Sequence, residues 1–258
     1  MRRICNFIAL LFMLVPTITL AQKGREFYQI TLYHFANAEQ EKVIDQYLKD
    51  AYVPALHRRG IKNVGVFKPI ANDTAMDKRI YILIPMKHLD ELSALSVRLL
   101  EDQQYLQSGK EYLDATFNNV PYSRMENIVL QAFPLAPKMN LPKLTSPKSD
   151  HVYELRSYES GTEKLYRNKV EMFNQGGEIK LFERLNFNAV FYAEVLAGSH
   201  MPNLMYMTSF ENKAERDAHW KSFGEDAEWK RLSALPQYQK NVSKADVLLM
   251  RAAEYSDY

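Results

Sequence analysis

The chain has 258 residues, a single cysteine (Cys5) and a formal net charge of +2 at pH 7. This length can bury the core of one large domain or of two small ones. A nearly neutral chain lacks the basic surface that nucleic-acid binding requires, so we expect no nucleic-acid partner. One cysteine cannot form an internal disulfide or a cysteine-rich metal site, so the fold must be stabilised by its core.

Residues 1–21 have the order of an export signal. Arg2 and Arg3 precede an apolar run at residues 8–15, and small residues lead to Ala21. The run is too short to span a bilayer comfortably, so we expect cleavage near Ala21, with an uncleaved anchor as the alternative. Removing these two arginines leaves 31 of the 33 basic residues against 31 acidic ones, a formal charge of zero. We therefore predict a periplasmic or secreted protein without membrane contact after cleavage.

The rest of the chain repeats one order of predicted elements. Residues 28–33 (YQITLY) and 153–158 (YELRSY) alternate apolar and polar residues, as half-buried strands do. Each is followed by a helical segment, two strands, a second helical segment and a closing strand. The further predicted strands are residues 63–70, 79–86 and 126–133 in the first half and residues 188–196, 203–210 and 245–252 in the second. RIYILIPM at 79–86 corresponds to NLMYMTSF at 203–210 in this alignment.

The order β-α-β-β-α-β in each half is typical of ferredoxin-like folds. Such a sheet carries helices on one face, so its other face needs a cover. We predict an α+β protein in which two tandem ferredoxin-like domains, residues 22–133 and 151–258, pack sheet to sheet as a pseudo-twofold α/β barrel. The Pro-rich residues 134–150 are predicted to be a linker. A homodimer through another surface stays open.

The second half resembles the NIPSNAP family over about residues 151–255. The resemblance is carried by YELRSY at 153–158, PNLMYMTSF at 202–210, the charged helix at 212–220 and EWK at 228–230. The first half resembles the family more weakly, and residues 87–92 depart from the charged helix start. The resemblance implies a dimeric α/β-barrel type of fold and no particular reaction. Related barrels include antibiotic-biosynthesis monooxygenases and haem-binding enzymes, a link through fold alone.

Alternation along the strands predicts a polar cluster on the open sheet face, inside the barrel. It separates Tyr153 and Leu155 from Glu154 and Arg156, and we expect the apolar set to lie under the helices. The ligand-binding candidates on the polar face are Glu154, Arg156, Tyr192, Glu194 and Tyr206, with Lys68 opposite them from the first half.

Two interpretations of this cluster are open. Arg156 could hold a ligand carboxylate by a two-pronged hydrogen bond, with Glu154 or Glu194 as a base. Alternatively, the charges form a buried ion-pair network that orients the two halves, since buried charges need partners in any fold.

His200 lies in a predicted loop between two strands, just before Pro202. A hairpin loop at a barrel mouth suits a functional histidine, and an ordinary exposed histidine is the alternative. The other histidines are scattered and no H-E-x-x-H motif occurs, so we expect no metal site and no cofactor. Haem ligation by one histidine is not excluded by these patterns.

Three functional hypotheses follow. In the first, an exported NIPSNAP-like protein binds a small organic or lipophilic ligand, or a protein partner. In the second, the barrel is a cofactor-independent monooxygenase-like enzyme that acts on an aromatic or lipophilic substrate. In the third, the protein is a structural module that dimerises.

Overall fold

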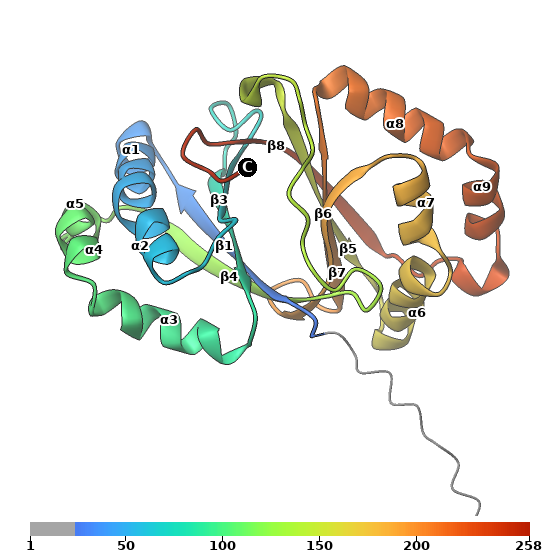
Figure 1. The fold of residues 1–258 in the computed structure, drawn as a ribbon, viewed down its shortest axis with the longest axis horizontal. Helices are drawn as coiled ribbons and strands as arrows, with labels where there is room; N and C mark the ends of the chain where they lie inside the picture. Colours follow the sequence, from blue (N-terminus) through green and yellow to red (C-terminus); the bar gives the residue numbers. More distant parts are fainter. Residues whose placement is uncertain (1–23) are drawn as a thin grey trace, which may run out of the picture.

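The computed structural model describes residues 24–258, so the predicted export signal at 1–21 lies outside the described residues. The fold is α+β: eight antiparallel strands form one closed barrel, and helices cover it on two opposite sides (Figure 1). The first half of the chain supplies the helices on one side, α1 to α5, and the second half supplies α6 to α9 on the other.

The elements follow the predicted order closely. The strands are β1 (Phe27–Phe35), β2 (Gly65–Pro69), β3 (Lys78–Met86), β4 (Arg124–Ala132), β5 (Val152–Glu159), β6 (Asn188–Ala197), β7 (Asn203–Phe210) and β8 (Lys244–Ala252). The α-helices are α1 (Ala38–Tyr47), α2 (Val53–Arg58), α3 (Asp90–Leu100), α4 (Gln103–Ser108), α5 (Lys110–Leu113), α6 (Glu163–Asn174), α7 (Glu178–Arg184), α8 (Lys213–Glu225) and α9 (Ala227–Ser233). A π-helical turn, Leu48–Tyr52, joins α1 to α2.

Local sequence sets the bounds of the helices in the second half. The side chains of Thr162 and Asn212 accept hydrogen bonds from the backbone N–H of Leu165 and Glu215, which caps the first turns of α6 and α8. Gly177 has φ 93°, a left-handed conformation that glycine adopts without a steric penalty. The chain therefore breaks between α6 and α7 at this glycine.

Around the barrel the strand order is β1-β3-β2-β8-β5-β7-β6-β4, and β4 pairs with β1 to close it. Each half contributes four neighbouring strands in matching order. The halves are joined by the pairs β2–β8 and β4–β6. The predicted barrel is confirmed, and the sheets share edge hydrogen bonds as well as an interior.

The barrel interior is apolar, which contradicts the prediction for the strand faces. Tyr153 and Leu155 belong to the core cluster inside the barrel, whereas Tyr192 and Tyr206 pack in the cluster beneath α6 to α8. Both faces of these strands are buried, so alternation separates the faces without saying which is inner. Helices bring long polar side chains that can pair with Glu154, and an interior lined by strands offers few such partners.

The two ends of the barrel differ. Where β1 and β5 begin, the ring of Tyr258 lies 5.4 Å from that of Phe67 and 6.1 Å from that of Tyr153. The Tyr258 hydroxyl donates to Sδ of Met139, at 3.2 Å, within the Pro-rich segment. This segment therefore packs against the barrel core and closes one end, while the end where β1 and β5 finish holds an open cavity.

Candidate functional site

An open cavity of about 460 Å³, which we call the barrel mouth, lies at the end where β1 and β5 finish. Its apolar wall continues the barrel core and comprises Leu32, Tyr81, Leu155, Val195, Met205 and Leu248. Its polar rim includes His34, Asp77, Arg79, Glu126, Ser157, His200 and Asn203. A concave surface that combines an apolar wall with placed polar groups is typical of small-molecule sites of this volume.

His34 is fixed at the rim between two carboxylates. Its Nδ1 lies 2.7 Å from Oδ1 of Asp77, and its Nε2 lies 3.1 Å from Oε1 of Glu126. Arg124 Nη2 lies 2.5 Å from the same Glu126 oxygen. The imidazole is only 8% exposed, so the ring has a fixed orientation on the wall formed by the first half.

A second histidine–carboxylate pair occupies the corresponding place in the second half. His200, in the loop between β6 and β7, has Nδ1 3.0 Å from Oε1 of Glu159, at the end of β5. In the alignment of the two halves, Glu159 occupies the position of His34. The strand residue is therefore the base in the first pair and the acid in the second. The imidazole of His200 is 56% exposed. The predicted position of His200 at a barrel mouth is confirmed, and its role remains a prediction.

Two buried polar atoms of the barrel mouth have no hydrogen-bond partner among residues 24–258: Nε of Arg79 and Oδ1 of Asn203. The nearest carboxylate of Arg79 is Asp77, whose Oδ2 lies 3.5 Å from Nε. Asn203 is 3% exposed and uses its other amide atom, Nδ2, to donate to Oγ of Ser157 at 2.8 Å. An unpartnered buried polar group costs about 1–3 kcal/mol, so such groups need an explanation.

Six of the seven sequence-predicted residues lie away from the barrel mouth. Three of them belong to a helix-side network that we define as Glu154, Arg156, Tyr158, Tyr206, Arg216 and Trp220. Glu154 is fully buried. Its Oε1 accepts from Nε of Arg156 at 2.5 Å, and its Oε2 accepts from Nε of Arg216 at 2.5 Å and from Nε1 of Trp220 at 2.9 Å. The carboxylate thus links α8 to β5, and both of its oxygens accept hydrogen bonds.

The remaining members of the helix-side network extend this pairing. Arg156 Nη1 donates to the Tyr158 hydroxyl, which lies 2.9 Å from that of Tyr206. The guanidinium of Arg156 lies 3.6 Å from the ring centroid of Trp220, within cation–π range. Burial raises the pKa of Tyr206 well above its ordinary value, so its hydroxyl stays protonated at neutral pH. The helix-side network lies within the second half, so Glu154 and Arg156 do not orient the two halves. Of the predicted charges, Glu194 does pair across the halves, with Arg25.

Three predicted residues form no hydrogen bond or ion pair with the helix-side network. Glu194 accepts from Arg25 Nη2 at 2.7 Å and from Arg167 Nη1 at 2.5 Å. Tyr192 stacks on Tyr206 with ring centroids 5.7 Å apart, and burial raises the pKa of its hydroxyl. The third residue, Lys68, lies on β2 in the other half.

Lys68 bonds within its own half. Its Nζ lies 2.8 Å from Oε1 of Glu41 and 2.5 Å from Oδ2 of Asp45, both on α1. The expected meeting of Lys68 with Glu154 and Arg156 across the barrel is therefore wrong. The reason is alternation: Phe67 lies in the interior core, which turns Lys68 toward the helices.

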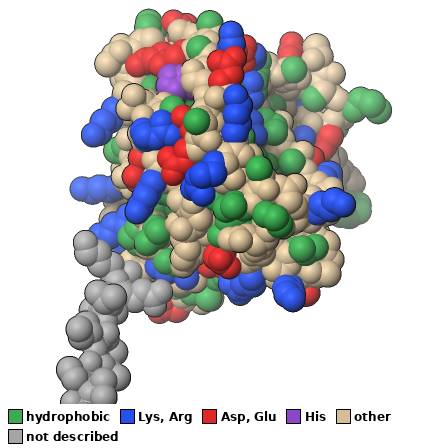
Figure 2. Space-filling model, turned by 90° about the vertical axis from the view of Figure 1, so that its right-hand side faces the viewer, with side chains coloured by type: hydrophobic (Ala, Val, Ile, Leu, Met, Phe, Trp, Pro, Cys, Tyr) green, Lys and Arg blue, Asp and Glu red, His purple; other side chains and the backbone are tan. Residues whose placement is uncertain are grey.

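Surface and metal-site features add little to these sites. Charges of both signs are mixed over the outer face of α6 to α9 (Figure 2). Within the described residues, no group of three or more His, Cys, Asp or Glu side chains could hold a metal ion. The part of the chain from 24 onward also has no helix that is long and apolar enough to cross a membrane.

Solved structures similar to this chain define its fold class, the α/β barrel. A provisionally assigned monooxygenase from Lactobacillus acidophilus NCFM has a TM-score of 0.57 at 9% identity, covering 88% of this chain and 94% of that one. One from Fusobacterium nucleatum subsp. nucleatum ATCC 25586 has a TM-score of 0.59 at 7% identity, covering 89% and 93%. An anthrone oxidase-like protein has a TM-score of 0.52 at 9% identity, covering 90% and 93%. Such identities show a shared fold alone.

Sequence comparison gives a family match for the second half of the chain: the NIPSNAP family model matches residues 153–257. This match confirms the resemblance seen in YELRSY and PNLMYMTSF. No curated protein matches the chain.

Proposed function

We propose that the protein binds a small organic ligand at the barrel mouth. The apolar part of the ligand would pack on the wall that includes Leu155 and Met205, and its polar groups would meet Arg79 and Asn203. The observation that carries this proposal is the coincidence of an open cavity, which has an apolar inner wall and a polar rim, with two unpartnered buried polar atoms. A ligand that formed hydrogen bonds with both atoms would remove the free-energy cost of leaving them without partners in the free protein.

The helix-side network is a poorer candidate for the same role. Glu154 already accepts three hydrogen bonds, and Arg156 is held by Glu154, Tyr158 and Trp220. A ligand carboxylate would have to displace a buried protein carboxylate to reach Arg156. Exchanging one ion pair for another gives little net free energy, because desolvation of charged groups opposes it.

The ligand-binding hypothesis fits what is known of the chain's relatives without depending on it. A NIPSNAP domain does not imply a reaction, and the similar barrels share only the fold. A cofactor-independent monooxygenase-like activity therefore remains a prediction, as do a protein partner and a homodimer.

The proposal also covers the domain organisation of the protein and its location in the cell. The matching strand order of the two halves supports tandem ferredoxin-like domains, residues 22–133 and 151–258, joined by residues 134–150. The charge pattern and apolar run of residues 1–21 support export to the periplasm or beyond. The intact mass of the protein recovered after export would test cleavage after Ala21.

Binding at the barrel mouth can be tested with anilinonaphthalene sulfonate, a fluorescent probe with an apolar body and an anionic group. We expect saturable binding to the wild type and at least about tenfold weaker binding to Ser157→Trp, whose indole would fill the cavity. Ser96→Trp, on an exposed face of α3, is the matched control and should bind as the wild type does. Equal binding by Ser157→Trp, with an unchanged circular dichroism spectrum, would contradict the proposal.

A further inference from the structure

We infer that the ligand of the barrel mouth is bifunctional: it carries a hydrogen-bond acceptor, such as a carboxylate, at one end and a donor, such as a hydroxyl, at the other. An apolar segment separates the two groups, as in an ω-hydroxy carboxylate. This inference rests on the proposed function and specifies the class of ligand.

The two unpartnered atoms face each other across the barrel. Arg79 is on β3 and Asn203 is on β7, and these strands are four positions apart in either direction around the closed eight-stranded barrel. Four positions of eight place them on opposite walls. One small polar group cannot reach both walls, so two separate groups are needed to satisfy them.

Both side chains point toward the same interior. On β3, Arg79 shares a strand face with Tyr81 and Leu83, which belong to the interior core. On β7, Asn203 shares a face with Met205 and Met207 of that core.

The internal repeat relates these two positions to each other. Arg79 begins RIYILIPM and Asn203 begins NLMYMTSF, the corresponding strands of the two halves. The pseudo-twofold arrangement thus presents a cationic donor from one half and a neutral acceptor from the other. A symmetric dicarboxylate would satisfy Arg79 but would leave Oδ1 of Asn203 without a donor.

The polarity of each atom defines the group it would bind. Arg79 Nε–H is a donor on a guanidinium, so its strongest partner is an anionic acceptor such as a carboxylate. Asp77 does not fill this role, because its Oδ2 is 3.5 Å from Nε and its Oδ1 is engaged by His34. Asn203 Oδ1 is an acceptor and requires a donor such as a hydroxyl. The wall between them is apolar, so the linking segment is apolar too.

Calorimetric titration with a graded series of ω-hydroxy alkanoates, from hydroxyhexanoate to hydroxydodecanoate, tests the inference. Each compound is compared with the alkanoate and the alkanol of the same length. Because the series varies the distance between the two end groups, it does not depend on knowing the span in advance. At the best length we expect the hydroxy acid to bind about tenfold more tightly than either monofunctional compound, which corresponds to one good hydrogen bond.

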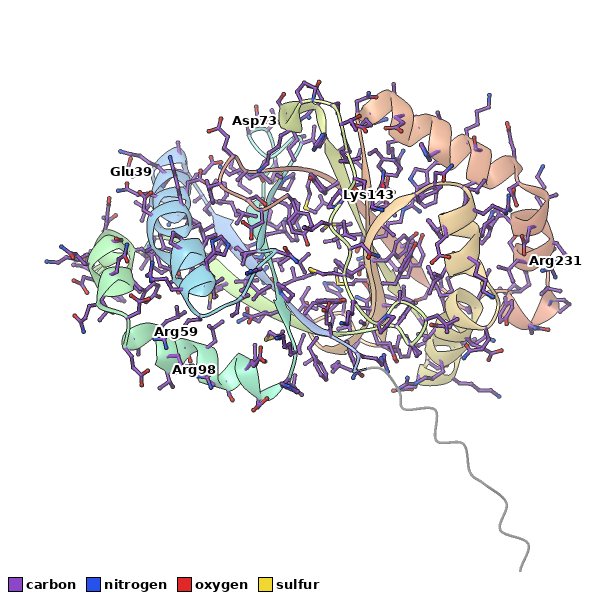
Figure 3. All side chains as sticks on the ribbon, in the orientation of Figure 1. Glu39, Arg59, Asp73, Arg98, Lys143 and Arg231 are labelled. Atoms are coloured by element: carbon purple, nitrogen blue, oxygen red, sulfur yellow. The ribbon has the colours of Figure 1, made fainter. Side chains whose placement is uncertain are left out.

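Two variants assign the end groups to the two walls. Arg79→Met should abolish the advantage of the hydroxy acid over the alkanol, and Asn203→Leu should abolish its advantage over the alkanoate. The matched controls are Arg98→Met, on the outer helical layer (Figure 3), and Asn118→Leu, in an exposed turn; both should bind as the wild type does.

The outcomes separate this inference from the proposed function. If alkanoates or alkanols bind as tightly as the hydroxy acids, the bifunctional ligand is wrong while binding at the barrel mouth stands. If neither these compounds nor anilinonaphthalene sulfonate binds, both are wrong. If the hydroxy acid is preferred but Arg79→Met and Asn203→Leu leave that preference unchanged, the assignment to these two walls is wrong.

Discussion

The barrel mouth and the helix-side network both contain charged and polar side chains of the barrel strands, yet they differ in how completely those side chains are paired. Glu154, with no exposed surface, has two guanidinium groups and an indole N–H against it. Arg79 and Asn203 each retain a buried polar atom without a partner in the described chain, beside an open cavity. Complete pairing indicates a structural role, and incomplete pairing next to a cavity indicates binding.

This difference also explains which residues the sequence pattern marks as candidates for a site. A run of polar residues within an apolar strand, such as Glu154 and Arg156, is conspicuous whatever its role. A single polar residue at a strand end, such as Arg79 or Asn203, resembles the start of a turn. The less conspicuous positions are the ones that the closed barrel brings together.

Removing the central carboxylate should give the largest effect on stability. Glu154→Gln leaves Arg156 and Arg216 without their anion, and breaking a buried pair in this way costs about 3–5 kcal/mol. Urea unfolding measures this loss, with Glu225→Gln at the exposed end of α8 as the control. A change below about 1 kcal/mol would mean that the network is solvated and that the contrast with the barrel mouth is overstated.

Replacing Arg156 and replacing Arg79 should have different effects on the free energy of unfolding. Arg156→Ala loses charge-assisted hydrogen bonds to Glu154 and Tyr158 and should destabilise the fold by about 1.5–3 kcal/mol. Arg79→Met removes an unpartnered buried donor, so its free energy of unfolding should stay within about 1 kcal/mol of the wild type or rise. Parallel melting curves compare them. An unchanged melting temperature for Arg156→Ala would count against the ion-pair network.

The ion pairs of Lys68 should matter less than those of Glu154, although both lie on the helix side of a sheet. Lys68, Glu41 and Asp45 have side chains 28%, 32% and 30% exposed, so water screens their attraction. We expect Lys68→Met to cost about 0.2–1 kcal/mol. A loss in urea unfolding as large as that of Glu154→Gln would show that exposure does not separate the two sites.

Glu211 gives the smallest expected effect and one that depends on pH. Hydrogen bonds from Ser146 and Thr145, in the Pro-rich segment, lower the pKa of Glu211 from 4.5 to about 2. Because the folded pKa is the lower one, the stabilisation is present above pH 4.5 and is lost as pH falls toward about 2.

Glu211→Gln should remove this dependence. The difference in unfolding midpoint between wild type and variant should therefore shrink across that pH window. A constant difference would mean that the carboxylate of Glu211 does not anchor the segment in solution.

Much of the fold could be predicted because its signals are local. The alternating strands, the repeated order of elements and the break at Gly177 can all be recognised within short windows of sequence. Each half is expected to form a sheet with helices on one face, so the other face of each sheet needs a cover. Packing the two sheets against each other supplies it and gives a barrel.

The assignment of inner and outer faces could not be predicted in the same way. In β7 all eight residues are buried, so neither face is marked by exposure to water. Which face is polar depends on Arg216 and Trp220, about sixty residues after Glu154 in the chain and brought to it by the packing of α8.

The barrel mouth depends on contacts that are still more distant in sequence. His34 lies on the same strand face as the interior residue Leu32, and this pattern could have placed it inside the barrel. Its contacts with Asp77 and Glu126, however, require strand pairing with β3 and β4. The position of His200 in the loop between β6 and β7 could be predicted, because it follows from the order of strands alone.

A crystal structure of the protein with anilinonaphthalene sulfonate would test the central claim most directly. We predict electron density for the probe at the barrel mouth, against Leu155 and Met205 and within hydrogen-bond distance of Arg79. Density beneath α6 to α8 beside Tyr192, or only on the outer surface of the helices, would contradict the assignment of binding to the barrel mouth.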